Sequence, residues 1–239
     1  MKALIVLLAT GAAMLAQPPA PTQPAAAPKA PAESPLLHPA NLKAKAPDNF
    51  KVKFVTTHGE FTVEVHRDWS PLGADRFYNL VKNKFFTDAA FFRYVPGFIV
   101  QFGIPAKPEI AKAWENANIP DDPKKPGVSN KKGTLVYATA GAGTRTTQFF
   151  INVADNGPSL DNNPGHFTPF AEVTEGMDIV LGLYSGYGGG PDEGGHGPRQ
   201  DLVQSQGKAY LDKNFPKLDS IKSATVLPAE GATPAAPKK

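Results

Sequence analysis

Cysteine is absent from the 239 residues, and this absence excludes disulfide bonds, zinc–thiolate sites and cysteine nucleophiles. Charge of one sign is also scarce, because 25 basic and 22 acidic residues leave a formal net charge of +3. No long basic stretch is interleaved with aromatic residues, so we expect no nucleic-acid partner. Five histidines lack metal-ligand spacing, and neither a G-x-S-x-G elbow nor a phosphate-binding loop occurs. Metal, serine-hydrolase and nucleotide chemistry therefore have little support.

Long hydrophobic runs are scarce as well. The apolar run over residues 3–15 follows a basic start and precedes small residues, which is the layout of a secretory signal peptide. The run is too short to cross a bilayer comfortably. We therefore expect a signal peptide over residues 1–16, cleaved after Ala13 or Ala16, and a periplasmic or secreted protein without stable membrane insertion. An uncleaved anchor is the alternative.

Proline is concentrated near the two ends of the chain. Residues 17–48 consist largely of Ala, Pro, Gln, Ser and Lys, and residues 229–239 have a similar composition. Such segments bury too little apolar area to offset the entropy of ordering them, so we predict a disordered linker and a disordered tail. One folded domain remains, residues 49–228, and its roughly 180 residues are enough for a well-buried core.

Short segments of alternating apolar and polar residues, separated by glycine and proline, fill this domain. Many short strands with regular turns favour a closed antiparallel barrel over a parallel sheet. Ser70 followed by proline is typical of a helix start, and helical spacing of apolar residues follows it. The predicted strands are 50–56, 60–66, 91–95, 98–102, 134–139, 148–153, 168–173 and 218–227. The predicted helices are 71–84 and 202–215.

Two segments are dense in arginine, aromatic residues and glutamine. They read FFRYVPGFIVQFG over residues 91–103 and GTLVYATAGAGTRTTQFFINV over residues 133–153. Most of their phenylalanines fit barrel strands with an aromatic core. That explanation fits less well for Arg93 and Gln101, which are polar residues in apolar strands, and for Gln148, which directly precedes two phenylalanines.

The first segment resembles the cyclophilin stretch F-H-R-x-x-P-G-F-x-x-Q-G-G, and the second resembles its partner G-x-x-x-M-A-N-A-G…S-Q-F-F-I. The likeness extends over residues 50–180, and the paired motifs are highly specific. The resemblance implies a mainly β fold, a closed eight-stranded antiparallel β-barrel capped by two α-helices, in agreement with the strand pattern. It also implies a peptidyl-prolyl cis–trans isomerase that acts on proline-containing polypeptides and uses no cofactor or metal.

The resemblance also implies the site residues. Arg93 matches the family's catalytic arginine, and Phe98 and Gln101 accompany it in the catalytic set. The positions that match substrate-binding residues are Ile99, Ala138, Thr139, Gln148, Phe150, Leu160 and Phe167. Within these sets, the walls of the proline pocket are Phe98, Ile99, Phe150 and Leu160.

The sequence departs from the family pattern in several places. Phe92 stands where histidine is common, and Thr139 replaces an asparagine. Ser159 occupies the position of a tryptophan in strongly cyclosporin-sensitive members, which argues against strong sensitivity to that drug. Residues 105–132 and 184–206 are longer than in minimal members, and the resemblance assigns them no role.

Three alternatives remain open at this point. Arg93 can serve as a structural ion pair at a barrel edge rather than as a catalytic group. The domain can be a non-catalytic chaperone that binds proline-containing chains without isomerising them. A small-ligand barrel of the lipocalin kind is a third class, although it needs a wide apolar interior that short aromatic strands do not favour. We expect a monomer in each case.

Overall fold

The computed structural model describes residues 33–229. The predicted signal peptide, residues 1–16, lies outside the described residues, and so do the first part of the predicted linker and nearly all of the predicted tail. None of the helices in the described part combines the length and apolarity needed to span a bilayer.

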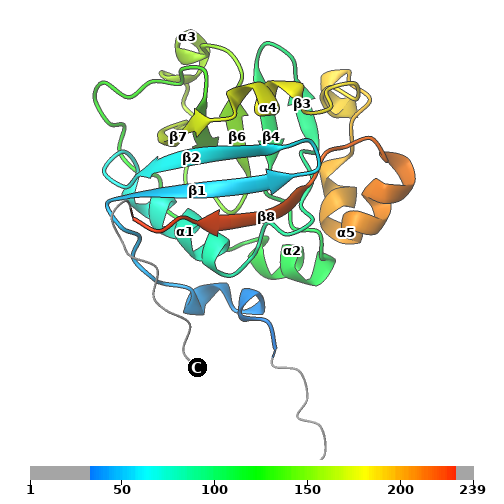
Figure 1. Cartoon of the computed structure of the whole chain (residues 1–239), viewed down its shortest axis with the longest axis horizontal. Coiled ribbons are helices and arrows are strands. Elements are labelled where there is room, and N and C mark those ends of the chain that lie inside the picture. The colour runs from blue at the N-terminus through cyan, green and yellow to red at the C-terminus, as the bar shows by residue number, and fades with distance from the viewer. Residues whose placement is uncertain (1–32, 230–239) are drawn as a thin grey trace, which may run out of the picture. The chain divides into compact units, whose positions relative to one another are not determined.

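Eight antiparallel strands form one sheet, as the sequence pattern predicts. The strands are β1 Asn49–Thr56, β2 Glu60–His66, β3 Arg93–Val95, β4 Ile99–Phe102, β5 Thr134–Tyr137, β6 Phe149–Asn152, β7 Pro169–Glu175 and β8 Ile221–Val226. Their order across the sheet is β3-β4-β6-β5-β7-β2-β1-β8. Strands β1, β2 and β8 lie side by side in Figure 1.

The sheet is a curled half-barrel, so the prediction of a closed barrel is wrong. Strands β3 and β8 are its two edges and do not pair with each other. The chain before β3 meets the start of β8 only over a short stretch, which holds an isolated bridge between Ala90 and Ser220. At one end of this stretch the amide of Asp88 donates to the carbonyl of Ile221 at 2.8 Å, and at the other the amide of Phe91 donates to the carbonyl of Asp219 at 3.0 Å. Asp88 has a φ of 61°, a left-handed conformation that an extended strand cannot contain. This turn conformation ends the paired stretch on the Asp88 side.

Both predicted helices are confirmed, and shorter helices accompany them in the described part of the chain. The α-helices are α1 Pro71–Lys82, α2 Pro108–Trp114, α3 Gly157–Leu160, α4 Met177–Gly182 and α5 Gln200–Asn214. Three 3₁₀ turns complete the set, η1 Pro35–Leu37, η2 Pro39–Asn41 and η3 Pro191–Glu193. The prediction of only two helices therefore missed α2, α3 and α4, whose four to seven residues are too few to establish a helical period in a sequence.

Aromatic rings fill the space between α1 and the inner face of the sheet. Phe77 of α1 lies among them, with ring centroids 5.4 Å from Phe149 and 6.3 Å from Phe54. Phe86 and Phe102 extend the cluster, with centroids 5.7 Å apart. Aromatic pairs at these distances add stability beyond the area they bury. Because rings occupy the interior, the structure does not support a ligand-binding barrel.

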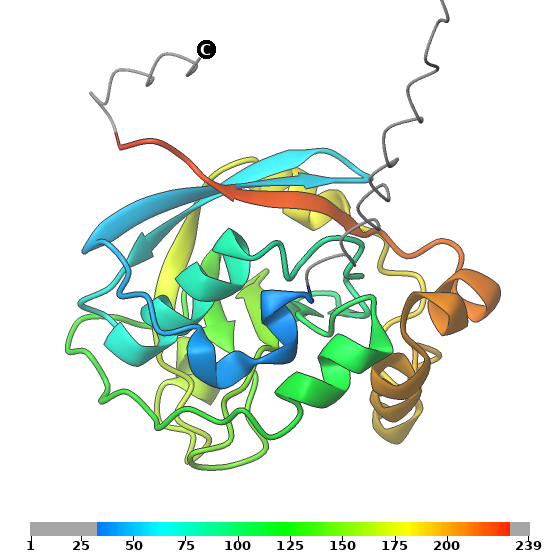
Figure 2. The ribbon, with the colours of Figure 1, turned by 90° about the horizontal axis from the view of Figure 1, so that it is seen from below.

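The predicted linker ends earlier than expected, because residues 33–48 pack against the domain. Leu36 is buried, and its carbonyl accepts a hydrogen bond of 2.8 Å from Nε1 of Trp114 in α2. The side chain of Asn79 in α1 donates to the carbonyl of Ala44 at 2.7 Å and accepts from its amide at 3.1 Å. This segment runs beside α1 and α2 in Figure 2. Its composition resembles that of a linker, but its few apolar residues find partners on these helices.

We expect Leu36→Ala to lower the free energy of unfolding by about 2–3 kcal/mol, because it removes a buried leucine and leaves a cavity. Urea unfolding of the purified protein measures this change. Leu72→Ala is the matched control, since Leu72 is 42% exposed, and surface substitutions usually change stability by less than about 0.5 kcal/mol. Equal effects of the two substitutions would show that residues 33–48 do not contribute to the core.

Candidate functional site

All ten predicted site residues line one cavity of about 420 Å³. Strand β3 contributes Arg93, and β4 contributes Ile99 and Gln101. The remaining predicted residues are Phe98 before β4, Ala138 and Thr139 after β5, Gln148 and Phe150 at β6, Leu160 at the end of α3, and Phe167 before β7. The sequence motifs are distant along the chain, and the fold brings them together.

Strand alternation divides each motif between the cavity and the core. Successive side chains of a strand point to opposite faces, so Ile99 and Gln101 face the cavity whereas Val100 and Phe102 are completely buried in the core. The register pairs Gln101 with both Arg93 of β3 and Phe150 of β6. The catalytic candidates therefore lie on one face because of the pleat.

One wall of the cavity is apolar. Ile99, Phe150 and Leu160 are buried and pack together, and Phe98 and Phe167 contact this cluster. The rings of Phe150 and Phe167 meet edge to face, with centroids 5.8 Å apart. The wall is thus an apolar surface against which a small ring such as pyrrolidine can pack.

Another part of the lining is a row of polar side chains. Nη1 of Arg93 donates to Oε1 of Gln101 at 3.1 Å, and Nε2 of Gln101 donates to Oε1 of Gln148 at 2.9 Å. Nε of Arg93 donates to Oε2 of Glu193 at 2.7 Å. An ion pair of Arg93, which the sequence left as an alternative, is therefore present at the edge strand β3, and its partner is the last residue of η3.

Five lining residues were not predicted from the sequence. Ala140, Thr144 and Thr146 lie within the second motif, so the motif itself marked their region. Glu193 and Gln200 come from the long region 184–206, to which the resemblance assigned no role. A cluster of glycines was the only sequence signal there.

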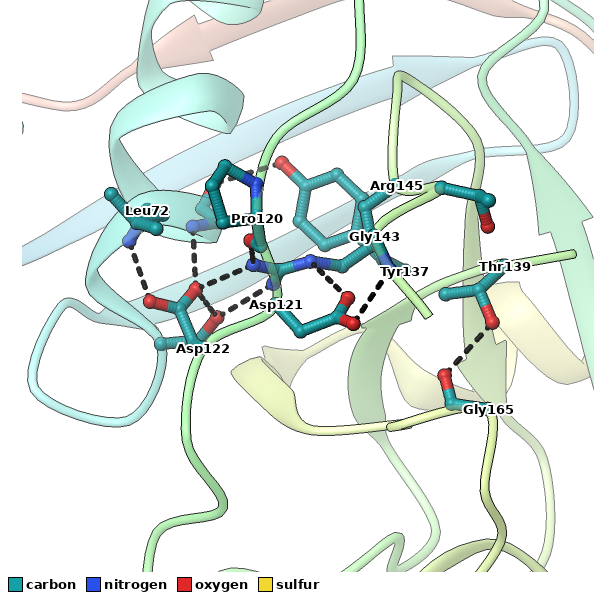
Figure 3. A network of polar contacts seen from close by, with 12 residues as sticks. Leu72, Pro120, Asp121, Asp122, Tyr137, Thr139, Gly143, Arg145 and Gly165 are labelled. Atoms are coloured by element: carbon teal, nitrogen blue, oxygen red, sulfur yellow. Dashed lines mark hydrogen bonds and ion pairs between the residues drawn. The ribbon is translucent and has the colours of Figure 1, made fainter. Parts of the chain in front are cut away.

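The loop between β5 and β6 forms the rim of the cavity and is anchored by a buried arginine (Figure 3). Arg145 has a side chain that is only 2% exposed, and its Nη2 donates to Oδ2 of Asp122 at 3.0 Å. The same guanidinium donates to the carbonyl of Pro120 and to Oγ of Ser70. Asp121 accepts from the amide of Gly143 at 2.7 Å. The long region 105–132 therefore supports the rim.

Asp122 also caps helix α1. Its carboxylate accepts from the amides of Leu72 at 3.0 Å and Gly73 at 2.9 Å, where a negative charge is favoured by the helix dipole. Ser70 precedes the helix, as predicted, but its side chain makes no capping hydrogen bond and instead donates to Asp122 at 2.5 Å. One aspartate thus joins the start of α1 to Arg145.

We expect Asp122→Asn to lower the free energy of unfolding by about 3 kcal/mol, because it leaves the charge of a buried arginine only partly compensated. Urea unfolding measures the change. Asp68→Asn is the control, since Asp68 pairs with Lys125 at 3.1 Å on the surface, where an ion pair contributes about 0–1 kcal/mol. A loss no larger than that of the control would contradict the anchoring role of Asp122.

Asp161, next to Leu160, anchors the other side of the cavity. Its carboxylate accepts from Oγ of Ser129 at 2.5 Å and from the amide of Asn130 at 2.8 Å. Burial raises the pKa of Asp161, but these hydrogen bonds outweigh it and hold the pKa below its usual 3.8. Nearby, Oγ1 of Thr139 donates to the carbonyl of Gly165 at 2.8 Å (Figure 3).

The lowered pKa predicts a pH dependence of stability. A carboxyl group whose pKa is lower in the folded chain stabilises the fold fully above about pH 4 and loses this effect as the pH falls through the folded-state pKa. We therefore expect Asp161→Asn to lower the melting temperature at pH 7, and the gap between parent and variant to begin to narrow near pH 4 and to close as the pH falls through the lowered folded-state pKa. Thermal melts from pH 7 to pH 2.5 test this. A gap that stays constant over this range would contradict it.

The comparisons with known proteins agree with this geometry. Residues 51–202 match the family model described as cyclophilin type peptidyl-prolyl cis-trans isomerase/CLD. A peptidyl-prolyl cis-trans isomerase of Acinetobacter baylyi is 32% identical over 141 residues, which cover 58% of this chain and 74% of that protein. Peptidyl-prolyl cis-trans isomerase B of Escherichia coli is 32% identical over 136 residues, which cover 54% of this chain and 80% of that protein.

Solved structures show the same fold. A cyclophilin type peptidyl-prolyl cis-trans isomerase of Cryptosporidium parvum aligns with a TM-score of 0.55 and 19% identity, covering 76% of this chain and 99% of that chain. A second structure of that protein, obtained in the presence of the dipeptide Ala-Pro, aligns with a TM-score of 0.54. From the family match, the relatives and the shared fold, we conclude that the chain belongs to the cyclophilin-type peptidyl-prolyl cis–trans isomerases.

Proposed function

We propose that this cyclophilin accelerates rotation about X–Pro bonds in the cavity beside Arg93. The observation that carries the proposal is one guanidinium and one apolar wall in the lining of the same cavity. Arg93, Gln101 and Gln148 form the polar side, and the cluster around Phe150 forms the apolar side.

The reaction makes few chemical demands. Rotation about an X–Pro bond has to disrupt amide resonance, with a barrier of about 18–20 kcal/mol, and takes tens to hundreds of seconds without a catalyst. No covalent bond is made or broken. A site without a nucleophile is therefore suited to it, provided that it favours the twisted amide over both planar forms.

The apolar wall supplies the first part of this preference. The twisted amide has less charge separation than the planar amide, so an environment of low polarity favours the twisted form. Phe98, Ile99 and Phe150 offer such surroundings, and we assign them to the proline ring. Leu160 and Phe167 close the same side of the cavity.

Arg93 supplies the second part. The prolyl nitrogen regains a lone pair only when resonance is lost, so a donor near that nitrogen stabilises the transition state more than either ground state. A hydrogen bond to a charged group contributes about 1.5–3 kcal/mol, which corresponds to about one to two powers of ten in rate. Gln101 fixes Arg93 from one side, and we assign Gln101 and Gln148 to the orientation of the substrate backbone.

The rim after β5 is suited to the peptide main chain. Ala138 and Thr139 line the cavity directly after β5 ends, and we propose that the backbone there pairs with an extended substrate. The apolar run at residues 3–15 supports the further proposal that the substrates are unfolded or loop segments of exported proteins in the periplasm or outside the cell.

We expect Arg93→Ala to lower the rate of isomerisation of an Ala-Pro peptide at least about tenfold, while the variant stays folded. Exchange NMR measures the rate without a coupled protease. Arg199→Ala is the matched control, because Arg199 is 60% exposed and pairs with Asp201 outside the cavity; its rate should stay near that of the parent.

Two outcomes would contradict the assignment. If folded parent protein does not accelerate exchange in several Xaa-Pro peptides, a non-catalytic chaperone becomes the better account. If the parent is active and Arg93→Ala remains equally active, the catalytic site lies elsewhere.

A further inference from the structure

The glycine-rich segment 186–197 forms a compact loop beside the edge strand β3. The amide of Gly197 donates to the carbonyl of Gly189 at 2.8 Å, and the amide of His196 donates to the carbonyl of Tyr187 at 3.0 Å. The loop is joined to β3 because the amide of Tyr94 donates to the carbonyl of Gly188 at 3.3 Å. Its attachment point is therefore next to Arg93 in the chain.

Glu193, the last residue of η3, is held in place by contacts with the neighbouring glycines of this loop. Its amide donates to the carbonyl of Gly190 at 3.0 Å. Its carboxylate lies directly over Gly189, where an added Cβ would come within 2.4 Å of Oε2. A side chain at position 189 would therefore displace the same oxygen that accepts from Arg93.

The two contacts of Arg93 restrain its guanidinium in different ways. Glu193 accepts from Nε at 2.7 Å, and Gln101 accepts from Nη1 at 3.1 Å. Because the guanidinium is planar and rigid, partners on two different nitrogens define the orientation of its plane. Among residues 33–229, Nη2 of Arg93 has no hydrogen-bond partner, and Arg93 lines the cavity, which leaves this group available to a substrate.

We propose that Glu193 is a positioning residue for the isomerase reaction, and that the glycine-rich loop serves to present its carboxylate to Arg93. The proposal rests on the function assigned to Arg93 above. Glu193 contacts Arg93 and acts through it, so its effect belongs to the turnover step rather than to the binding of the proline ring.

Stability alone does not account for this contact. The side chain of Glu193 is 46% exposed, and pairs with an exposed member contribute little to folding. Because Glu193 is exposed, solvent screens its negative charge. Glu193 therefore reduces the positive electrostatic potential around Arg93 only weakly. Orientation of the guanidinium is the larger effect, and removal of Glu193 should slow the reaction.

The first experiment compares Glu193→Gln with the parent in the exchange NMR assay on an Ala-Pro peptide. We expect kcat to fall about three- to fivefold, the range that a partly exposed charge pair supports, with KM unchanged. In an Arg93→Ala background the same substitution should have no further effect, because Glu193 then has no guanidinium to orient. A purely structural role would lower the rate equally in both backgrounds and would overturn the proposal.

Gly189→Ala is a second, independent variant. It keeps the charge of Glu193 but moves its carboxylate away from Arg93, since only the far end of a flexible side chain has to shift. We expect a similar fall in kcat. Asp192→Asn is the matched control, because Asp192 is a neighbouring exposed acid that shares no hydrogen bond or ion pair with Arg93. Its kcat should stay within about twofold of the parent.

The ¹⁵Nε–¹Hε signal of Arg93 gives a readout that does not depend on activity. This signal should be protected from solvent exchange in the parent, and the protection should be lost in Glu193→Gln and Gly189→Ala. If the parent is active but kcat is unchanged or raised in Glu193→Gln and Gly189→Ala, the positioning role alone is overturned. A parent without activity would instead reject the function of the site, while the NMR signal would still report the contact.

Discussion

The rim of the cavity depends on one interaction, the buried ion pair of Arg145 and Asp122. Asp122 binds the first amides of α1 and the guanidinium together, so the helix that fills the curled sheet and the loop that forms the cavity rim share one anchor. A buried charge is tolerated only when it is paired and hydrogen-bonded, and here the region 105–132 supplies the partners. A segment with no apparent role in the sequence therefore determines where the rim lies.

The cavity combines two kinds of support. Its apolar wall and the glutamine row are parts of the strands themselves, so their positions follow from pleat and register. Its rim and its contact to the guanidinium of Arg93 depend on loops held by long-range polar contacts, since Glu193 and Arg93 are 100 residues apart in the chain. The strands therefore position the apolar wall and the glutamine row, and the loops determine how accurately the rim and the guanidinium of Arg93 are oriented.

The sequence predicted the strands, both longer helices and ten of the fifteen residues that line the cavity, because alternation and paired motifs are local patterns. It did not predict Glu193, Asp122 or the packing of Leu36, because the partners of a lone acid or leucine are chosen by contacts between distant segments. It also predicted a closed barrel where the sheet is open, since the left-handed turn at Asp88 leaves no trace in a hydrophobic pattern.

The four residues of β4 alternate between the substrate face and the core, with Ile99 and Gln101 on one side and Val100 and Phe102 on the other. A shift of one position would exchange these faces completely. The length of this stretch is therefore more tightly constrained than its composition. Another aliphatic residue at position 99 would still form the apolar wall. Loss of a single residue from β4, by contrast, would place Gln101 among the core phenylalanines and turn Phe102 toward the substrate.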